Sequence, residues 1–139
     1  MNDLDGGKPW YRVYRCADGK YLSFAALEKR FRSIFCEAIG WSGDALDVSG
    51  AEAEAAAGKR LEALFLEKER DEWCHLLGSV DACVAPVLST SEAPNHRWNA
   101  ERDVFATING VVQPAAAPRF SATPAAPPAA VPQPGEGLE

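Results

Sequence analysis

The stretch PWYRVYRCADGKYLSFAALEKRF, residues 9–31, contains the strongest structural signals in the chain. Residues 10–15 and 20–25 are rich in aromatic and β-branched side chains, which favour strands. Between them lies Asp18-Gly19, a dipeptide typical of hairpin turns because glycine adopts positive φ without strain. The stretch therefore predicts a β-hairpin that leads directly into a helix.

Helical periodicity begins where the predicted hairpin ends. Between residues 27 and 39, apolar side chains recur every three or four positions: Leu27, Phe31, Ile34, Phe35, Ala38 and Ile39. Gly40 predicts the end of this helix. Two further helices are predicted over residues 51–66 and 69–77, the second ended by Gly78. We expect their inward side chains to be Ala55, Leu61, Leu64, Phe65, Trp73, Leu76 and Leu77.

The second half of the chain adds a strand and another hairpin. Residues 82–88 form a short apolar run, in which Pro86 should lie at an edge or at the strand's end because it has no N–H. Ser89 or Thr90 then caps a brief helical turn that Pro94 limits. Asn109-Gly110 predicts a hairpin between residues 104–108 and 111–113. The fold class is therefore α+β, a small domain with β-hairpins flanking three helices.

Proline separates a tail from this domain. Seven of the ten prolines lie between residues 114 and 134, where they remove donors and fix φ, so an extended or polyproline-like chain is expected. We predict a domain over residues 1–113 and a Pro/Ala-rich tail over 114–139. The tail is either solvated or a strap that docks through Arg119-Phe120-Ser121. Trp41 and Trp98 are expected to be buried.

Charge and composition narrow the class of partner. The 139 residues include 14 basic and 20 acidic side chains, and the net charge of −6 argues against nucleic acid or an anionic membrane as partner. No apolar run approaches the ~20 residues of a membrane-spanning helix. Four cysteines without a C-x-x-C pair are too sparse for a small secreted domain held by disulfides. We therefore expect a cytoplasmic protein with reduced thiols.

The sequence contains little catalytic equipment of its own. It has no glycine-rich phosphate loop, no G-x-S-x-G turn and no H-E-x-x-H pair. His75 is expected at a boundary or surface, and His96 in an exposed polar loop. Cys74, His75 and Cys83 offer metal-binding atoms, but adjacent side chains diverge and the spacing matches no usual zinc pattern. We expect neither a metal nor a bound cofactor.

One carboxylate, Glu28, has a more unusual position. It follows the small residues Ala25 and Ala26, at the junction of the predicted strand and helix. Free N–H groups and the helix dipole favour an ionised carboxylate there by about 0.3–1 kcal/mol, which alone explains many acidic residues at helix starts. Strand-to-helix junctions are also common functional positions. Glu28 is therefore the candidate site residue, with helix stabilisation as the alternative.

Ordered segments along nearly the whole chain share a pattern with one known family. They are Pro9-Trp10-Tyr11-Arg12-Val13-Tyr14, Ala17-Asp18-Gly19-Lys20-Tyr21, Ala26-Leu27-Glu28 with Phe31, Asp71-Glu72-Trp73, Asp81-Ala82-Cys83-Val84-Ala85-Pro86-Val87-Leu88, Ala93, Gly110-Val111, and Pro118-Arg119-Phe120-Ser121 with Thr123-Pro124. In this order they resemble the small domain of the α-methylacyl-CoA racemases, which belong to the family III CoA-transferase (CaiB/BaiF) superfamily. Residues 43–58 carry no family signature.

The resemblance implies an enzyme longer than this chain. A large Rossmann-like domain would precede it, and two chains would interlock so that each active site joins one large domain to the partner's small domain. Family racemases use a large-domain histidine and aspartate as the acid/base pair, and Glu28 matches the small-domain glutamate beside that histidine. The implied reaction interconverts (2R)- and (2S)-2-methylacyl-CoA by removing and returning the α-proton. Acyl-CoA is then the substrate, and this chain alone should be inactive.

Two other functions remain open from the sequence. A family III CoA-transferase, which moves CoA between carboxylic acids through a large-domain aspartate, is similar at Ala85-Pro86-Val87-Leu88-Ser89. A protein-interaction module without catalysis also fits the composition. The order of Asp18-Gly19-Lys20-Tyr21 and Ala26-Leu27-Glu28 favours the racemases.

Overall fold

A computed structural model of the chain describes residues 3–126, 129–130 and 132. It divides into two compact units, Met1–Val87 and Leu88–Glu139. The boundary predicted at residues 113/114 rests on composition and stays a prediction. Within the described residues, no helix is both long and apolar enough to cross a membrane.

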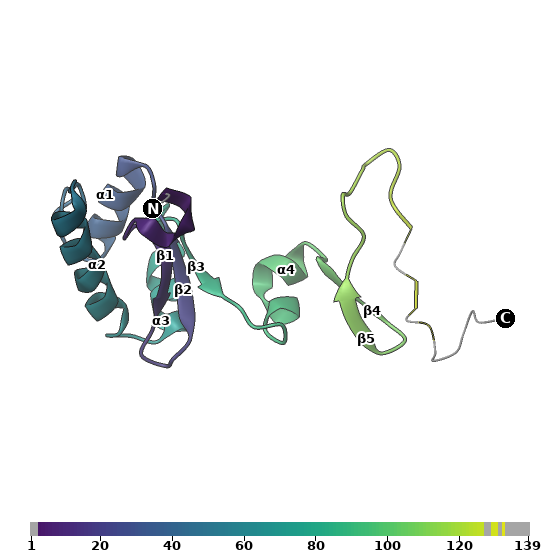
Figure 1. The fold of residues 1–139 in the computed structure, drawn as a ribbon. Helices are drawn as coiled ribbons and strands as arrows, with labels where there is room; N and C mark the ends of the chain where they lie inside the picture. Colours follow the sequence, from purple (N-terminus) through teal and green to yellow (C-terminus); the bar gives the residue numbers. More distant parts are fainter. Residues whose placement is uncertain (1–2, 127–128, 131, 133–139) are drawn as a thin grey trace. The chain divides into compact units, whose positions relative to one another are not determined.

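A three-stranded antiparallel sheet forms the centre of the first unit (Figure 1). Its strands, in the order β1-β2-β3, are β1 (Tyr11–Arg15), β2 (Tyr21–Ala25) and β3 (Val84–Val87). The turn between β1 and β2 has Gly19 at φ +78°, and the Lys20 N–H donates to Oδ1 of Asp18 at 3.1 Å. The first predicted hairpin is confirmed. The predicted edge position of Pro86 is also confirmed, because β3 lies at the edge of the sheet and pairs with β2 alone.

Three helices follow the predicted order. They are α1 (Lys29–Ala38), α2 (Ala51–Phe65) and α3 (Arg70–Leu77), and a short π-helical turn, η1 (Asp3–Gly7), precedes the sheet. At the end of α1, Gly40 has φ +77°, and the Trp41 N–H donates to the Cys36 carbonyl at 2.8 Å. This left-handed glycine confirms the predicted helix stop. At the start of α3, Glu69 and Glu72 form a reciprocal capping box.

The core of the first unit is built around aromatic rings. Strand alternation sends Tyr14 from β1 and Phe24 from β2 to the side where the helices pack. The Phe65 ring lies 4.9 Å from Tyr14 and 5.5 Å from Trp73, between centroids. Phe35 of α1 lies 4.4 Å from Phe24. Every buried side chain that the structure describes belongs to this unit.

Several burial predictions were wrong. Leu61, Leu64 and Phe65 of α2 are buried as predicted. Ala55 is exposed, because the helix places Ala57 rather than Ala55 on their face. Leu76 is 42% exposed, since it is next to the buried Leu77 and consecutive helical side chains point about 100° apart. Trp98 is 54% exposed and Trp41 is half-buried. On α1, only Phe35 of the predicted stripe is fully buried; the other stripe residues are partly buried and pack around the core.

The second unit consists of turns, two short helices and a two-stranded hairpin. These are η2 (Ala93–Asn95), α4 (Arg97–Glu101), β4 (Phe105–Ile108) and β5 (Val111–Pro114). Asn109 and Gly110 both have positive φ, +50° and +81°, which confirms the second predicted hairpin. The predicted cap is present, because the Ser89 N–H donates to Glu92 and the Glu92 N–H donates to Oγ of Ser89. The sequence predicted an exposed polar loop at His96-Arg97-Trp98-Asn99; His96 is instead the half-buried residue before α4, and residues 97–101 form that helix.

Within the second unit, the start of the tail is hydrogen-bonded to earlier residues, and the Ala115 N–H donates to the Val104 carbonyl at 2.9 Å. Arg119 donates hydrogen bonds to the carbonyls of Arg102 and Asp103, which follow α4. Phe120 beside it is 58% exposed. Within this unit the guanidinium rather than the aromatic ring makes the contact, and docking of the tail through Phe120 stays a prediction. The predicted tail beyond residue 132, together with residues 127, 128 and 131, lies outside the described residues.

Candidate functional site

Glu28 lies between the sheet and α1, as its sequence position predicts. Its backbone is extended, with φ −79° and ψ 139°, and it is the residue immediately before the helix. Its carbonyl accepts hydrogen bonds from the N–H groups of Phe31 at 3.1 Å and Arg32 at 3.4 Å. The side chain is exposed and makes no capping hydrogen bond to the described helix. The backbone of Glu28 thus starts the helix, while its carboxylate points away from this role and stays available.

A short buried segment fixes the chain in front of Glu28. The Ala25 N–H donates to the Cys83 carbonyl at 3.0 Å, which ties this segment to the loop before β3. Ala26 is fully buried, and the Leu27 N–H donates back to the Ala25 carbonyl at 3.1 Å. A larger side chain at residue 26 would have to displace core atoms. The small side chain of Ala26 is therefore required by packing, whereas Ala25 is exposed.

Arg32 contacts this segment from one turn into α1. Its Nη1 donates to the Ala26 carbonyl at 3.2 Å and also to the Leu27 carbonyl. The guanidinium carbon lies 4.5 Å from the centroid of the Trp10 ring, which is itself buried. One arginine thus contacts both residues immediately before Glu28. The sequence gives no signal for this contact, because Arg32 falls among the polar residues of an amphipathic helix.

The Glu28 carboxylate influences the ionisation of a nearby thiol, that of Cys83. It is half-buried and has φ +53°, a backbone conformation that is uncommon for a residue with a side chain. Burial raises the pKa of its thiol, and the Asp81 and Glu28 carboxylates raise it further, while Arg30 opposes them. A thiol held in its protonated form is a poor nucleophile. Cys83 therefore shapes the loop beside Glu28 but is not activated for catalysis.

The possible metal ligands do not form a site. Among residues 3–126, 129–130 and 132, no group of three or more His, Cys, Asp or Glu side chains is placed to hold a metal ion. Cys74 is half-buried and His75 is exposed on α3. His96 precedes α4 in the second unit. The described residues near Glu28 therefore offer carboxylates, Glu28 itself and Asp81 near the Cys83 thiol, but no cluster placed to hold a metal ion.

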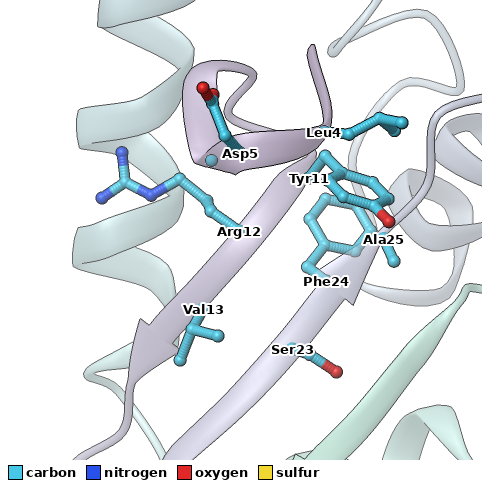
Figure 2. Close-up of a pocket in the computed structure, with 9 residues that line it drawn as sticks. Leu4, Asp5, Tyr11, Arg12, Val13, Ser23, Phe24 and Ala25 are labelled. Atoms are coloured by element: carbon cyan, nitrogen blue, oxygen red, sulfur yellow. The ribbon is translucent and has the colours of Figure 1, made fainter. Parts of the chain in front are cut away.

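A hollow of about 390 Å³ lies on the face of the sheet that the helices leave open. Figure 2 shows Val13 of β1 and Ser23 of β2 side by side in it, with Leu4 and Tyr11 at the end near η1. Val13 is 50% exposed, and Tyr21 and Val87 on the same face are 46% and 41% exposed. Glu28 does not line this hollow. Exposed apolar side chains cover much of this face, and Asp5 of η1 and Arg12 of β1 add charged groups to the lining of the hollow.

A second hollow, of about 740 Å³, lies between η1 and α2, and two of the basic residues that line it are paired with carboxylates. Nζ of Lys8 lies 2.8 Å from Glu54, and Nη2 of Arg12 lies 2.5 Å from Glu62. An anionic ligand would have to compete with these carboxylates for the same cations. This hollow is therefore a weaker candidate for binding an acyl-CoA phosphate than its basic residues suggest.

Comparison with proteins of known sequence gives curated relatives. The mouse "Alpha-methylacyl-CoA racemase" is 36% identical over 129 residues, which are 91% of this chain and 34% of that protein. The human protein of the same name is 37% identical over the same shares. A Caenorhabditis elegans "CaiB/baiF CoA-transferase family protein" is 30% identical over 73% of this chain and 29% of its own length. The chain spans about a third of the length of these relatives.

Solved structures share the fold. A crystal structure of the Mycobacterium tuberculosis hypothetical protein Rv3272 matches 91% of this chain and 38% of its own, with a TM-score of 0.68 and 19% identity. Its orthorhombic crystal form gives a TM-score of 0.66 at 17% identity, over 84% of this chain and 34% of that one. The family described as CoA-transferase family III matches residues 1–137. The chain therefore belongs to family III of the CoA-transferases.

Proposed function

We propose that this chain is the small, C-terminal domain of a 2-methylacyl-CoA racemase. The identity of 36–37% to two α-methylacyl-CoA racemases over 91% of the chain supports the choice within the family. The observation that carries the mechanism is the exposed Glu28 carboxylate, held at the start of α1 without a capping bond. Glu28 is the proposed catalytic residue of this domain.

The reaction requires proton transfer on two faces of one carbon. A proton α to a thioester carbonyl is acidic enough for a positioned base to remove, provided that the enolate oxygen is stabilised. Racemisation needs one group to remove the proton and a second to return it on the opposite face. In the proposed enzyme a histidine and an aspartate outside this chain do so. The Glu28 carboxylate would orient that histidine and stabilise its protonated form.

The proposal also defines the partners. Acyl-CoA is the substrate, no further cofactor takes part, and the active enzyme is an interlocked homodimer in the cytoplasm. In the proposal the acid/base pair lies outside this chain, so this chain alone should not catalyse exchange.

The test is exchange of the α-proton of (2S)-2-methylacyl-CoA in D₂O, followed by NMR. The chain is measured alone and again within a complete protein in which it follows a family large domain. Exchange only in the complete protein supports the racemase. Exchange by the chain alone would contradict the division of catalytic groups between two domains.

Substituting Glu28 tests its part in the chemistry. Glu28→Gln in the complete protein should lower turnover about 100-fold, the scale of a positioned acid/base contribution. The midpoint of thermal unfolding should change by less than about 2 °C, because the side chain is exposed and makes no capping bond. Glu37→Gln, an exposed position on the same helix, is the matched control and should keep full activity. Wild-type exchange by Glu28→Gln would remove Glu28 from the mechanism.

A CoA-transferase is the second candidate. The family match itself and the 30% identity to the C. elegans CaiB/BaiF-family protein support it. Such an enzyme would move CoA from a thioester to a free carboxylic acid through an aspartate outside this chain. Acyl transfer without α-proton exchange in the complete protein would favour it.

The protein-interaction module is the third candidate. The open face of the sheet exposes Val13, Tyr21 and Val87, and exposed apolar side chains gathered on one face favour binding to another protein. A complete protein that performed neither exchange nor transfer would leave this function as the best supported.

A further inference from the structure

We propose that Arg32 is a positioning residue that holds the backbone before Glu28 and so directs the Glu28 carboxylate. This inference rests on the proposed role of Glu28. It concerns a residue that touches neither Glu28's carboxylate nor, in the proposal, the substrate. Three observations support it. Arg32 donates to two backbone carbonyls, its guanidinium stacks on Trp10, and no other hydrogen bond to those carbonyls is present in the described chain.

The carbonyl contacts place Arg32 at the point where the chain turns from β2 into α1. Ala26 and Leu27 belong to neither element, so no ladder or helical hydrogen bond accepts at their carbonyls within the described chain. Nη1 of Arg32 bonds both carbonyl oxygens, one at 3.2 Å. A charged donor makes stronger hydrogen bonds than a neutral one, and two acceptors on one nitrogen fix the relative orientation of two successive peptide planes. The next residue along this fixed backbone is Glu28.

The guanidinium is itself held in place. It stacks 4.5 Å from the centroid of the Trp10 ring, and Trp10 is only 6% exposed. Nε of Arg32 is buried and has no hydrogen-bond partner among the described residues. Burying an unpaired N–H costs free energy. The carbonyl bonds and the contact with Trp10 hold the side chain in place despite this cost. A planar, stacked guanidinium explains why arginine, rather than lysine, suits residue 32.

Glu28 depends on this anchor because its own side chain makes no capping bond to the helix. Its remaining backbone contacts, from the N–H groups of Phe31 and Arg32, fix only its carbonyl. Loss of the Arg32 bonds would leave the Leu27–Glu28 peptide free to rotate. The carboxylate would then sample directions away from the group that it is proposed to orient.

The first test does not depend on catalysis. In the 139-residue chain, Arg32→Met should lower the backbone ¹⁵N order parameters of Leu27 and Glu28, and Arg32→Lys should restore them in part. The matched control is Arg60→Met, because Arg60 also stacks on a tryptophan, 3.5 Å from the Trp41 centroid, but lies on α2. Unchanged order parameters in Arg32→Met would overturn the proposal, whatever reaction the complete protein catalyses.

The second test is a double-mutant cycle in the complete protein. Arg32→Met alone should lower kcat for α-proton exchange about 10-fold with KM changed less than twofold. In the Glu28→Gln background it should cause no further loss, because Arg32 acts only through Glu28. An equal fold-loss in both backgrounds would show a general structural role and overturn the proposal. If the wild-type protein transferred CoA and exchanged no proton, the proposed function would fail, and the order parameters would still decide the anchor.

Discussion

At the scale of single residues, buried groups that ionise at high pH limit the stability of the fold. Burial raises the pKa of the Cys16 thiol to about 11, from 9.0, and Cys16 is 1% exposed. The folded state therefore keeps its proton where the unfolded chain loses it. The free energy of unfolding should hold up to about pH 8 and fall as the pH rises through 9–11. Urea titrations at each pH should show a shallower fall in Cys16→Ala; an unchanged pH profile would contradict this assignment.

Local sequence patterns specify only part of the candidate site. Glu28 could be found because hairpin and helix patterns, both local, meet at residues 25–28. The role of Arg32 could not, since it depends on where Trp10, 22 positions earlier, stands in the folded molecule. The left-handed conformation of Cys83 was missed for a similar reason. The Cys83 carbonyl accepts the Ala25 N–H, a contact between segments nearly 60 residues apart that no local pattern reveals.

At the scale of elements, two glycines should respond to alanine with opposite signs. Gly40 ends α1 at φ +77°, where a side chain costs about 1–2 kcal/mol, so Gly40→Ala should be destabilising by that amount. Gly58 lies inside α2, and an added Cβ would meet Pro9 and Arg12 at ordinary distances of 3.6 and 3.8 Å. Gly58→Ala should stabilise by roughly 0.5–1 kcal/mol. Chemical denaturation of both variants checks the pair: stabilisation by Gly40→Ala would refute the helix-stop argument, and destabilisation by Gly58→Ala would refute the second prediction.

Elements were predicted better than their burial. Turn chemistry and periodicity act within a few residues, so both hairpins and the first three helices follow from the sequence. The pattern placed Leu61, Leu64 and Phe65 correctly on the inward face of α2, where Phe65 packs against Tyr14 and Trp73, but it also placed the exposed Ala55 there. Helix α4 is five residues long and has no buried residue, so it produced no apolar periodicity to detect.

At the scale of the whole molecule, the buried side chains that the structure describes are confined to Met1–Val87. This unit should therefore fold by itself. A chain ending at Leu88, which keeps the 3.0 Å bond from Arg70 to the Val87 carbonyl, should retain the free energy of unfolding of residues 1–139 within about 1 kcal/mol. Urea denaturation followed by tryptophan fluorescence checks this. A loss of several kcal/mol would show that the second unit contributes to the core.

The edge position of Pro86 has a consequence for how copies of this molecule behave at high concentration. Since the Ala25 N–H bonds the Cys83 carbonyl, alternation along β3 turns residue 86 away from β2, toward the free edge. A neighbouring copy that tried to extend the sheet there would find no N–H at the middle of the strand. Proline thus protects the β3 edge of the sheet against edge-to-edge polymerisation. Pro86, which predicts an edge strand from the sequence, therefore also prevents a strand of another copy from pairing with β3.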